Sequence, residues 1–336
     1  MVQNRRSFLK TAGMATAVAS AAPLALSMRG GLPGDPSPVA AMDGRSYVAG
    51  RFALELEGKS AGILSAYGGG FPYGVVAYGD GDGDDPIVHK HISNVKYEEI
   101  TIQISSDVDE ALWNWVADTM DGKAPRKSGS VIFLDEAFNA TRALDFHDAL
   151  ITEITFPAMD GSSKETAYMT VVISPESTSY VAASGKVTIN AGKQKKWLTS
   201  NFRCTLGDMP TKRVSKIDSF TIKQGIIEAE TGERRRPQIE PAKLEIPNLS
   251  ITLAEVDSDP WFKYFDDFVI RRSDKEISGV LEYLAPDLKT VLGSVAFAGV
   301  GIFKCAPDKV EAGGEQIKRI KAEMYVERMN LERQRG

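Results

Sequence analysis

The three histidines are the residues whose type and spacing come nearest to a chemical site. His89 and His91 are two positions apart, so on a strand their imidazoles would share one face, as in some zinc sites. His147, followed by Asp148, is the one other histidine that could complete a ligand set. Because no third ligand lies near the pair in sequence, ordinary surface or loop histidines are the favoured interpretation, and no metal site is predicted.

Hydrolytic chemistry has equally little support. The chain lacks a Gly-x-Ser-x-Gly elbow, and His147, the candidate base, is expected within a strand. The acidic run GDGDGDDP, residues 79–86, alternates its aspartates like a calcium loop but has no bidentate Glu at the twelfth position. A solvated loop is therefore favoured there. We predict no catalytic residue and no cofactor, and a protein that is not an enzyme.

Charge and cysteine content narrow the class further. The net charge of -5 argues against a sequence-independent nucleic-acid binder, which needs a basic surface. The run Arg234 to Arg236 is expected in a loop, where a solvated contact between subunits is favoured over nucleic-acid binding. Cys204 and Cys305 are expected on different strands; they could pair in an oxidising compartment, but two buried free thiols are favoured.

The N-terminal residues predict export. An arginine pair, an aromatic-leucine-lysine sequence and a weakly apolar Ala-rich run are typical of a twin-arginine signal, here carried by Arg5, Arg6, Phe8, Leu9 and Lys10. The alternative is a plain basic tail. We predict a signal peptide over 1–28 and a disordered Gly/Pro-rich spacer over 29–46, with cleavage after Ala21 or after Ala41 left open. The mature protein is expected to be extracellular or periplasmic, delivered by the twin-arginine export machinery.

The elements that carry the rest of the chain are organised around one strand and the helix that follows it. Ile100, Ile102 and Ile104 alternate with polar residues, the period of a strand with one buried face. The next stretch, SSDVDEALWNWV, combines capping residues, an acidic first turn and an apolar face, and predicts a helix. Its tryptophans, Trp113 and Trp115, are expected to pack the helix on its sheet, with a contact between subunits as the alternative.

The same pattern returns later in the chain. Leu249 lies 149 positions after Ile100 and begins LSITLAEVDSDPWFKYF, where Asp259-Pro260 opens a helix and Trp261 lies on its apolar face. Other strands recur in the same order: NFRCTLGD follows the pattern of RFALELEG, and SGVLEYLAPD that of GSVIFLDEAF. We predict a tandem duplication. The fold class is mainly β, two antiparallel β-barrel or sandwich domains with one flanking helix each, over 47–178 and 199–332 with a linker over 179–198.

A family resemblance follows from these motifs. The strand, the capped helix with LWNW, the segment RKSGSVIFLDEAFN, and the strands ending in TFPAMDGSS and ETAYMTVVI resemble the tail tube proteins of contractile phages and related injection systems. The resemblance covers nearly all of the first unit. The second unit keeps the apolar pattern but lacks the RK and LDE residues.

The resemblance implies a structural role. Members of the family join sheets edge to edge into six-membered rings that stack into a hollow tube, and they have no catalytic residues. Two units in one chain would let three chains complete a pseudo-sixfold ring. Alternatives are a trimeric hub, cap or adaptor of a contractile injection particle, and a secreted ligand-binding β-domain protein. Expected partners are the chain itself, other tail-like components and the export machinery, with no nucleic acid.

Overall fold

The alternating apolar runs fold as antiparallel strands in the computed structural model, which describes residues 51–78, 90–105, 109–187, 197–229, 238–308 and 318–332. We refer to residues 51–187 as half 1 and to residues 197–332 as half 2. The strands of half 1 are β1 (Arg51–Leu56), β2 (Lys59–Leu64), β3 (Ala66–Gly69), β4 (Pro72–Tyr78), β5 (Lys90–Tyr97), β6 (Ile100–Ile104), β7 (Lys127–Leu134), β8 (Ala140–Phe156), β9 (Met159–Asp160), β10 (Met169–Ser174) and β11 (Ser177–Ala182). Those of half 2 are β12 (Phe202–Leu206), β13 (Val214–Ile217), β14 (Phe220–Ala229), β15 (Gln238–Glu245), β16 (Leu249–Ala254), β17 (Ile277–Leu284), β18 (Val291–Pro307) and β19 (Arg319–Glu332).

Each half has one α-helix between corresponding strands. The helical elements are α1 (Glu110–Met120), the 3-10 turn η1 (Glu255–Asp257), α2 (Ser258–Phe265) and the π-helical turn η2 (Asp266–Ile270). Trp115 of α1 donates its indole N–H to the Pro125 carbonyl at 2.8 Å, and Trp261 of α2 donates to the Pro210 carbonyl at 3.2 Å. Both rings are buried. The two rings belong to the hydrophobic core, as predicted, whereas Trp113 of α1 lies against Gly293 of half 2.

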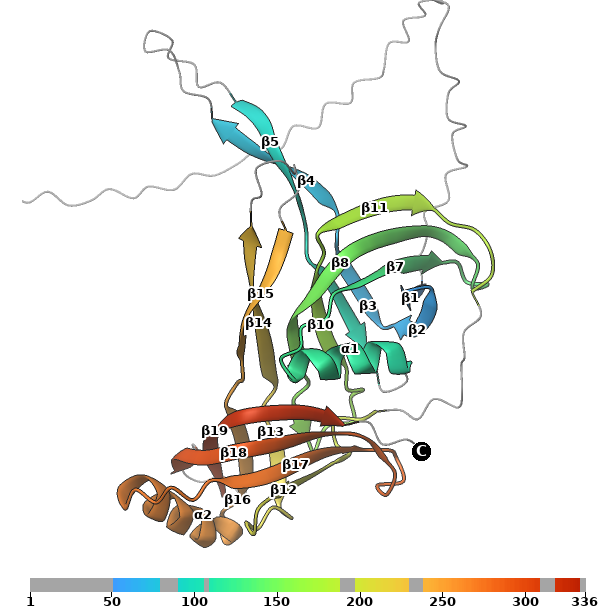
Figure 1. Ribbon diagram of the computed structural model, residues 1–336. Helices are drawn as coiled ribbons and strands as arrows, with labels where there is room; N and C mark the ends of the chain where they lie inside the picture. The colour runs from blue at the N-terminus through green and yellow to red at the C-terminus, as the bar shows by residue number, and fades with distance from the viewer. Residues whose placement is uncertain are drawn as a thin grey trace, which may run out of the picture. The chain divides into compact units, whose positions relative to one another are not determined.

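The two halves have the same strand order. Half 1 runs β2-β1-β7-β8-β10-β6-β3, and half 2 runs β12-β17-β18-β19-β16-β13 (Figure 1). Apart from β2, the strands of the first order correspond one by one to those of the second, from β1 with β12 to β3 with β13. In half 1 the two ends of the order, β2 and β3, are consecutive in the chain and separated by Ser65 alone. The sheet of half 1 thus curls back on itself. In half 2 no strand of the described residues takes the place of β2.

Local details recur with the strand order. Gly279 lies 150 positions after Gly129, and at each glycine a Cβ would come within 2.4 Å of a carbonyl oxygen of the neighbouring strand, β1 or β12. The long strands β8 and β18 each have a residue with positive φ at the same point, Asp148 at 48° and Gly299 at 63°. Each marks a bulge that bends the strand without ending it.

The halves share one hydrophobic core. Phe156 of β8 stacks on Phe220 of β14 with ring centroids 5.0 Å apart, and Tyr283 of β17 lies 6.3 Å from Phe156 and 4.7 Å from Trp197. Helix α1 also touches half 2, because a Cβ at Gly293 would come within 2.9 Å of the Trp113 ring. Residues 48–336 accordingly form a single compact unit, and the fold is mainly β with curled sheets.

The segment TRALDFHDALITEITFPAMD, with turn residues at Pro157 and Asp160-Gly161, predicts two strands, and the structure has β8 and β9 there. Strand β8 runs for 17 residues, through the bulge at Asp148. The linker expected over 179–198 differs at its start, because strand β11 extends to Ala182 and pairs with β8 over Arg142–His147. None of the described helices is long and apolar enough to cross a membrane.

Candidate assembly surfaces

A β-hairpin from half 2 adds to the sheet of half 1. Strand β14 continues the edge of β8 past the end of β7, pairing Phe220 to Lys223 with Phe156 to Glu153 (Figure 1). Thr155 and Thr221 are opposite each other with their hydroxyls 2.8 Å apart, and Lys223 Nζ lies 2.8 Å from Glu153 Oε1. In return, β9 of half 1 pairs with β13 of half 2. The chain therefore contains two edge-to-edge joints between its own halves.

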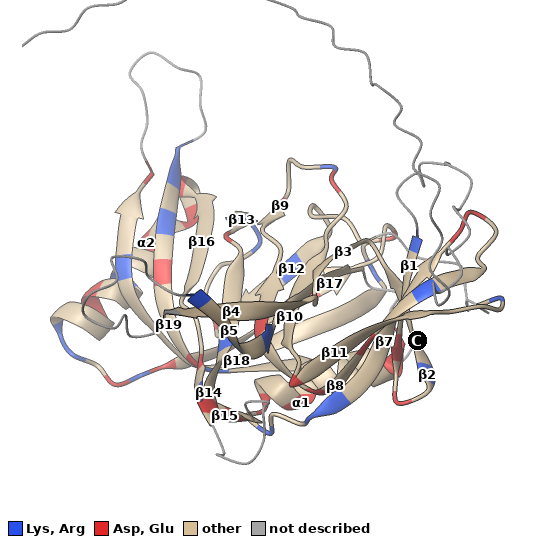
Figure 2. Cartoon of the chain, turned by 90° about the horizontal axis from the view of Figure 1, so that it is seen from above, with Lys and Arg blue, Asp and Glu red and all other residues tan. Residues whose placement is uncertain are grey.

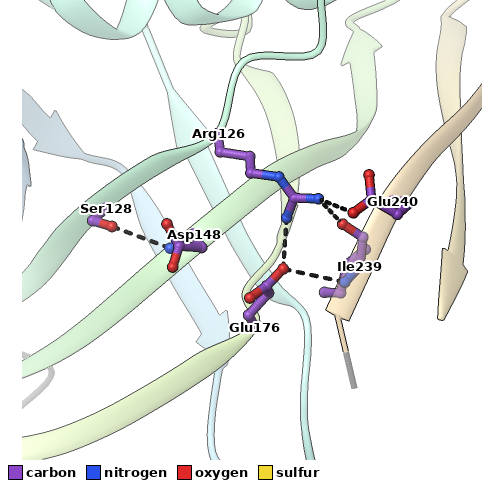
Figure 3. A network of polar contacts seen from close by, with 6 residues as sticks. All are labelled: Arg126, Ser128, Asp148, Glu176, Ile239 and Glu240. Carbon is purple, nitrogen blue, oxygen red and sulfur yellow. Dashed lines mark hydrogen bonds and ion pairs between the residues drawn. The ribbon is translucent and has the colours of Figure 1, made fainter. Parts of the chain in front are cut away.

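A polar network fixes the far strand of this hairpin, β15 (Figure 3). Arg126 Nη1 donates to Glu176 Oε1 at 2.6 Å, and Nη2 donates to the Ile239 carbonyl and lies 3.2 Å from Glu240 Oε1. The Ile239 N–H donates to the same Glu176 oxygen at 3.2 Å. Glu176 and Arg126 are 19% and 30% exposed, so the guanidinium compensates a carboxylate that is largely withdrawn from water. The network ties half 1 to β15 with a defined geometry.

No described strand outside the hairpin of half 1, β4–β5, pairs with it. It forms a separate two-stranded sheet, pairing Pro72 with Tyr97 and Tyr78 with Lys90 (Figure 1). An isolated hairpin is marginal in water, and exposed strand edges are a hazard in a monomer. Its large apolar side chains are also exposed, namely Phe71 (43%), Tyr73 (47%), Val76 (49%), Ile92 (66%) and Val95 (42%). These features are typical of a surface that another strand or chain covers.

Half 2 has an open strand edge at the point where half 1 receives β14. Strand β17 pairs with β18 only as far as Val300, so on that side no described strand pairs with β18 over 303–307. Phe303 in this segment is 41% exposed. Beside it, the Tyr325 hydroxyl donates to Glu276 Oε1 at 2.6 Å. This hydrogen bond, with burial and the charges of Glu276 and Glu327, raises the pKa of Tyr325 to about 12.

The candidate metal ligands among the described residues, His91 and His147, are not brought together into a site. His91 lies on β5 opposite Ala77, and His147 lies on β8 opposite Ser177. Within the described residues no group of three or more His, Cys, Asp or Glu side chains could hold a metal ion. Cys204 and Cys305 are free thiols, and burial raises the pKa of the Cys204 thiol to about 12 and that of Cys305 to about 11.

Several predicted features fall outside the described residues. These are the export signal with Arg5, Arg6, Phe8, Leu9 and Lys10, the spacer 29–46, His89, the acidic loop 79–86 and the run Arg234 to Arg236. In the described part, basic and acidic residues are interspersed and do not gather on one basic face (Figure 2). Sequence analysis did not single out Arg126, Glu176 or Glu240. The signal that could have led to them is the 149-residue offset, which aligns the β4–β5 hairpin with β14–β15.

Comparison with known proteins gives a match for half 1. The model of the family described as T4-like virus tail tube protein gp19 matches residues 48–179, less than half of the chain. No curated protein matches.

Solved structures with similar chains come from injection particles. A chain of the anti-feeding prophage baseplate is 15% identical with a TM-score of 0.32 over 39% of this chain and 89% of its own. One of the anti-feeding prophage tube-terminating cap is 12% identical with a TM-score of 0.38 over 45% and 97%. One of the sheath-tube complex of the extracellular contractile injection system PVC is 11% identical with a TM-score of 0.34 over 40% and 89%.

Proposed function

We propose that this chain is a structural subunit of a phage-tail-like tube or filament, built from two tail-tube-like domains fused in tandem. The observation that carries the proposal is the match of residues 48–179 to the tail tube family. The strand order of half 1 recurs in half 2, which supports a duplication of the same unit. On this proposal half 2 is a second tube domain, over 199–332, although the family match does not extend to it.

Three chains complete one ring of six domains with pseudo-sixfold symmetry. The joints between β14 and β8 and between β13 and β9 support this, because they connect the two halves through strand edges. Closing a ring covers such edges all round, and stacking of rings through unlike faces extends a tube. The protein acts by assembly and has no catalytic role. Its partners are further copies and other tail-like components.

Electron microscopy and analytical ultracentrifugation of the purified mature protein test this proposal. We expect rings of three chains with sixfold appearance, stacked into tubes as concentration rises. Discrete trimers that never stack would favour a hub, cap or adaptor, the second role, which the two domains per chain also suit. Monodisperse monomers at high concentration would contradict both.

The export part of the proposal has its own test. The twin-arginine pattern at Arg5 and Arg6 supports assembly outside the inner membrane. Replacing both, Arg5→Lys and Arg6→Lys, should retain the full chain in the cytoplasm, as measured by cell fractionation. A matched change outside the pattern, Arg29→Lys, should leave export unaltered. Equal export of both variants would rule out twin-arginine delivery.

A further inference from the structure

We propose that the β4–β5 hairpin of one chain docks on half 2 of the next copy in the register that β14–β15 uses on half 1 of its own chain, with His91 facing Glu276. The inference rests on the proposed ring and names the contact that closes it. The joint inside the chain serves as the template, since hairpin and receiving edge both have counterparts.

The two hairpins are built alike. In β4–β5, Tyr73 pairs with Lys96, Gly74 with Val95 and Val76 with Ile92; in β14–β15, Lys223 pairs with Glu245, Gln224 with Leu244 and Ile226 with Pro241. Both have their irregularity at the same place, between Gly74 and Val76 and between Gln224 and Ile226. The β4–β5 hairpin thus has the shape of the β14–β15 hairpin but no sheet to join.

The receiving edges correspond as well. Ile302 of β18 faces Met324 as Ile151 of β8 faces Ile173, so the segment Lys304–Ala306 of β18 occupies the place of Glu153–Thr155. On β8 this edge holds β14, and on β18 it holds no described strand. Transferring the register places Phe71 opposite Ala306, Pro72 opposite Cys305 and Tyr73 opposite Lys304. The exposed rings of Phe71 and Tyr73 would be covered along with Phe303.

The acidic residue lies on the hairpin at one edge and on the receiving half at the other. Half 1 presents Arg126 to the hairpin residue Glu240. In half 2 the position of Arg126 is taken by Glu276, just before β17, and in β5 the position of Glu240 is taken by His91. Glu327 stands at the position of Glu176, so half 2 is acidic beside the β18 edge. We call Glu276 and Glu327 the receiving corner of half 2, and Arg126 and Glu176 that of half 1. The hairpin strand that would enter the corner of half 2 begins with Lys90 and His91. Each hairpin therefore suits one receiving corner and not the other.

The occupant is a second copy because the chain's own hairpin is elsewhere. Lys96 Nζ of β5 lies 2.8 Å from Glu228 of β14, so β4–β5 lies beside the β14–β15 hairpin, and it does not pair with β18. A hairpin from another copy fills the open edge of half 2 and leaves its own half 2 open for the next. This head-to-tail contact closes into a ring of alternating halves.

The joint between chains has fewer backbone hydrogen bonds than the one within the chain. The Phe71 carbonyl accepts from the Glu98 N–H at 3.1 Å, so the backbone polar groups of Phe71 face β5. Because these groups alternate in direction along a strand, those of Pro72 face the open edge. Pro72 offers a carbonyl there but no N–H. Phe71 and Ala306 form a non-hydrogen-bonded pair, the type whose side chains are closest.

Disulfide trapping tests the register. In a chain with Cys204→Ala and Cys305→Ser, the pair Phe71→Cys and Ala306→Cys should link chains to each other on oxidation in more than about tenfold higher yield than Val76→Cys with Ala306→Cys, which is out of register. The matched positive control, Thr155→Cys with Thr221→Cys, should link within one chain. If Phe71→Cys impairs assembly under reduction, Tyr73→Cys with Lys304→Cys tests the same register.

Charge exchange tests the specificity. His91→Glu or Glu276→Arg alone should weaken ring formation by about tenfold or more, and the double variant should restore it because it copies the Arg126–Glu240 pair. Rings that form normally in wild type but show no Phe71–Ala306 link and no effect of either charge variant would overturn this contact and leave the proposed function standing. A wild type that never forms rings would overturn both.

Discussion

Half 1 and half 2 have one strand order but differ at the corner where a hairpin can be received. In half 1 the corner contains Arg126, and β14–β15 fills it. In half 2 the corner contains Glu276 and Glu327, and no described strand covers the edge of β18. The sheets are alike because their apolar positions are alike, whereas the corners differ by a few charged residues. The filled edge and the open edge therefore differ in the few charged residues beside them.

The largest expected effect tests whether the two halves, which share a core, also unfold together. Trp115→Ala and Trp261→Ala each remove a fully buried ring, so each should lower the free energy of unfolding by about 3–5 kcal/mol. Because the core is continuous, urea unfolding followed by circular dichroism and fluorescence should remain one transition in both variants. Val256→Ala, at a 74% exposed position, should change stability by less than about 0.5 kcal/mol. Two transitions of which only one shifts would show independent halves.

Arg126→Ala and Glu276→Ala should show that the two corners contribute differently to stability. It leaves Glu176 largely withdrawn from water without its cation, and should cost about 1–3 kcal/mol of unfolding free energy. Glu276→Ala removes one hydrogen bond from the Tyr325 hydroxyl and should cost about 1 kcal/mol or less in the monomer. Arg126→Lys should fall between wild type and Arg126→Ala, because it keeps the charge but not the two-pronged donor. Equal costs in thermal or urea unfolding would contradict the difference between the corners.

Alkaline pH should affect both halves for different reasons. The pKa of Tyr67 in half 1 is raised to about 12, first by burial and then by the charges of Tyr180 and Glu98. That of Tyr325 in half 2 is raised to about 12, first by its hydrogen bond to Glu276. Since both exceed the unfolded value of about 10, their contribution is complete below pH 10 and is lost as the pH rises to 12.

Tyrosinate absorbance distinguishes these two causes. Glu276→Gln should lower the pKa of Tyr325 and leave that of Tyr67 unchanged. Tyr325→Phe and Tyr67→Phe identify the two titrations, and each should reduce the loss of stability between about pH 10 and 12. If Glu276→Gln leaves both titrations where they were, the hydrogen bond is not the main cause.

The smallest effect is expected at two exposed ion pairs beside the receiving edges, one with Glu153 and the other with its counterpart Lys304. Lys223→Ala on the joint and Lys304→Ala on the open edge each remove one partner of a solvent-exposed pair, with Glu153 and Glu323 respectively. Each should lower the unfolding midpoint only slightly, and less at high salt, because solvent screens such pairs. A larger cost for Lys223→Ala would mean that the joint depends on this pair more than on the stacked Phe156 and Phe220.

The strand and helix framework could be predicted because its signals are local. The alternation of Ile100, Ile102 and Ile104, and of Leu249, Ile251 and Leu253, predicts strands whose inward side chains are fully buried. The aromatic residues of each helix predict its buried face. The two strands predicted over TRALDFHDALITEITFPAMD are β8 and β9, and the bulge at Asp148 interrupts the alternation of β8 without ending its pairing.

The joints could not be predicted because they depend on contacts far apart in sequence. Nothing near Phe220 indicates that it lies against Phe156, and Arg126 meets Glu240 only after β14–β15 has crossed to half 1. The described histidines that were weighed as metal ligands and not favoured as such, His91 and His147, lie on separate strands, and no described group of three or more ligand residues includes them. The charged corner residues carry no motif, and only their counterparts 150 or so positions away reveal them.

The joint between β8 and β14 has a kinetic consequence because both strands belong to one chain. Tethering replaces a bimolecular encounter by an intramolecular one, so this contact forms at an effective concentration set by the connecting polypeptide and not by the amount of protein present. Every second contact in a ring of such chains would then be complete at any dilution. Only the remaining contacts would set the critical concentration for growth, which makes the onset of assembly less steep than for single-domain subunits.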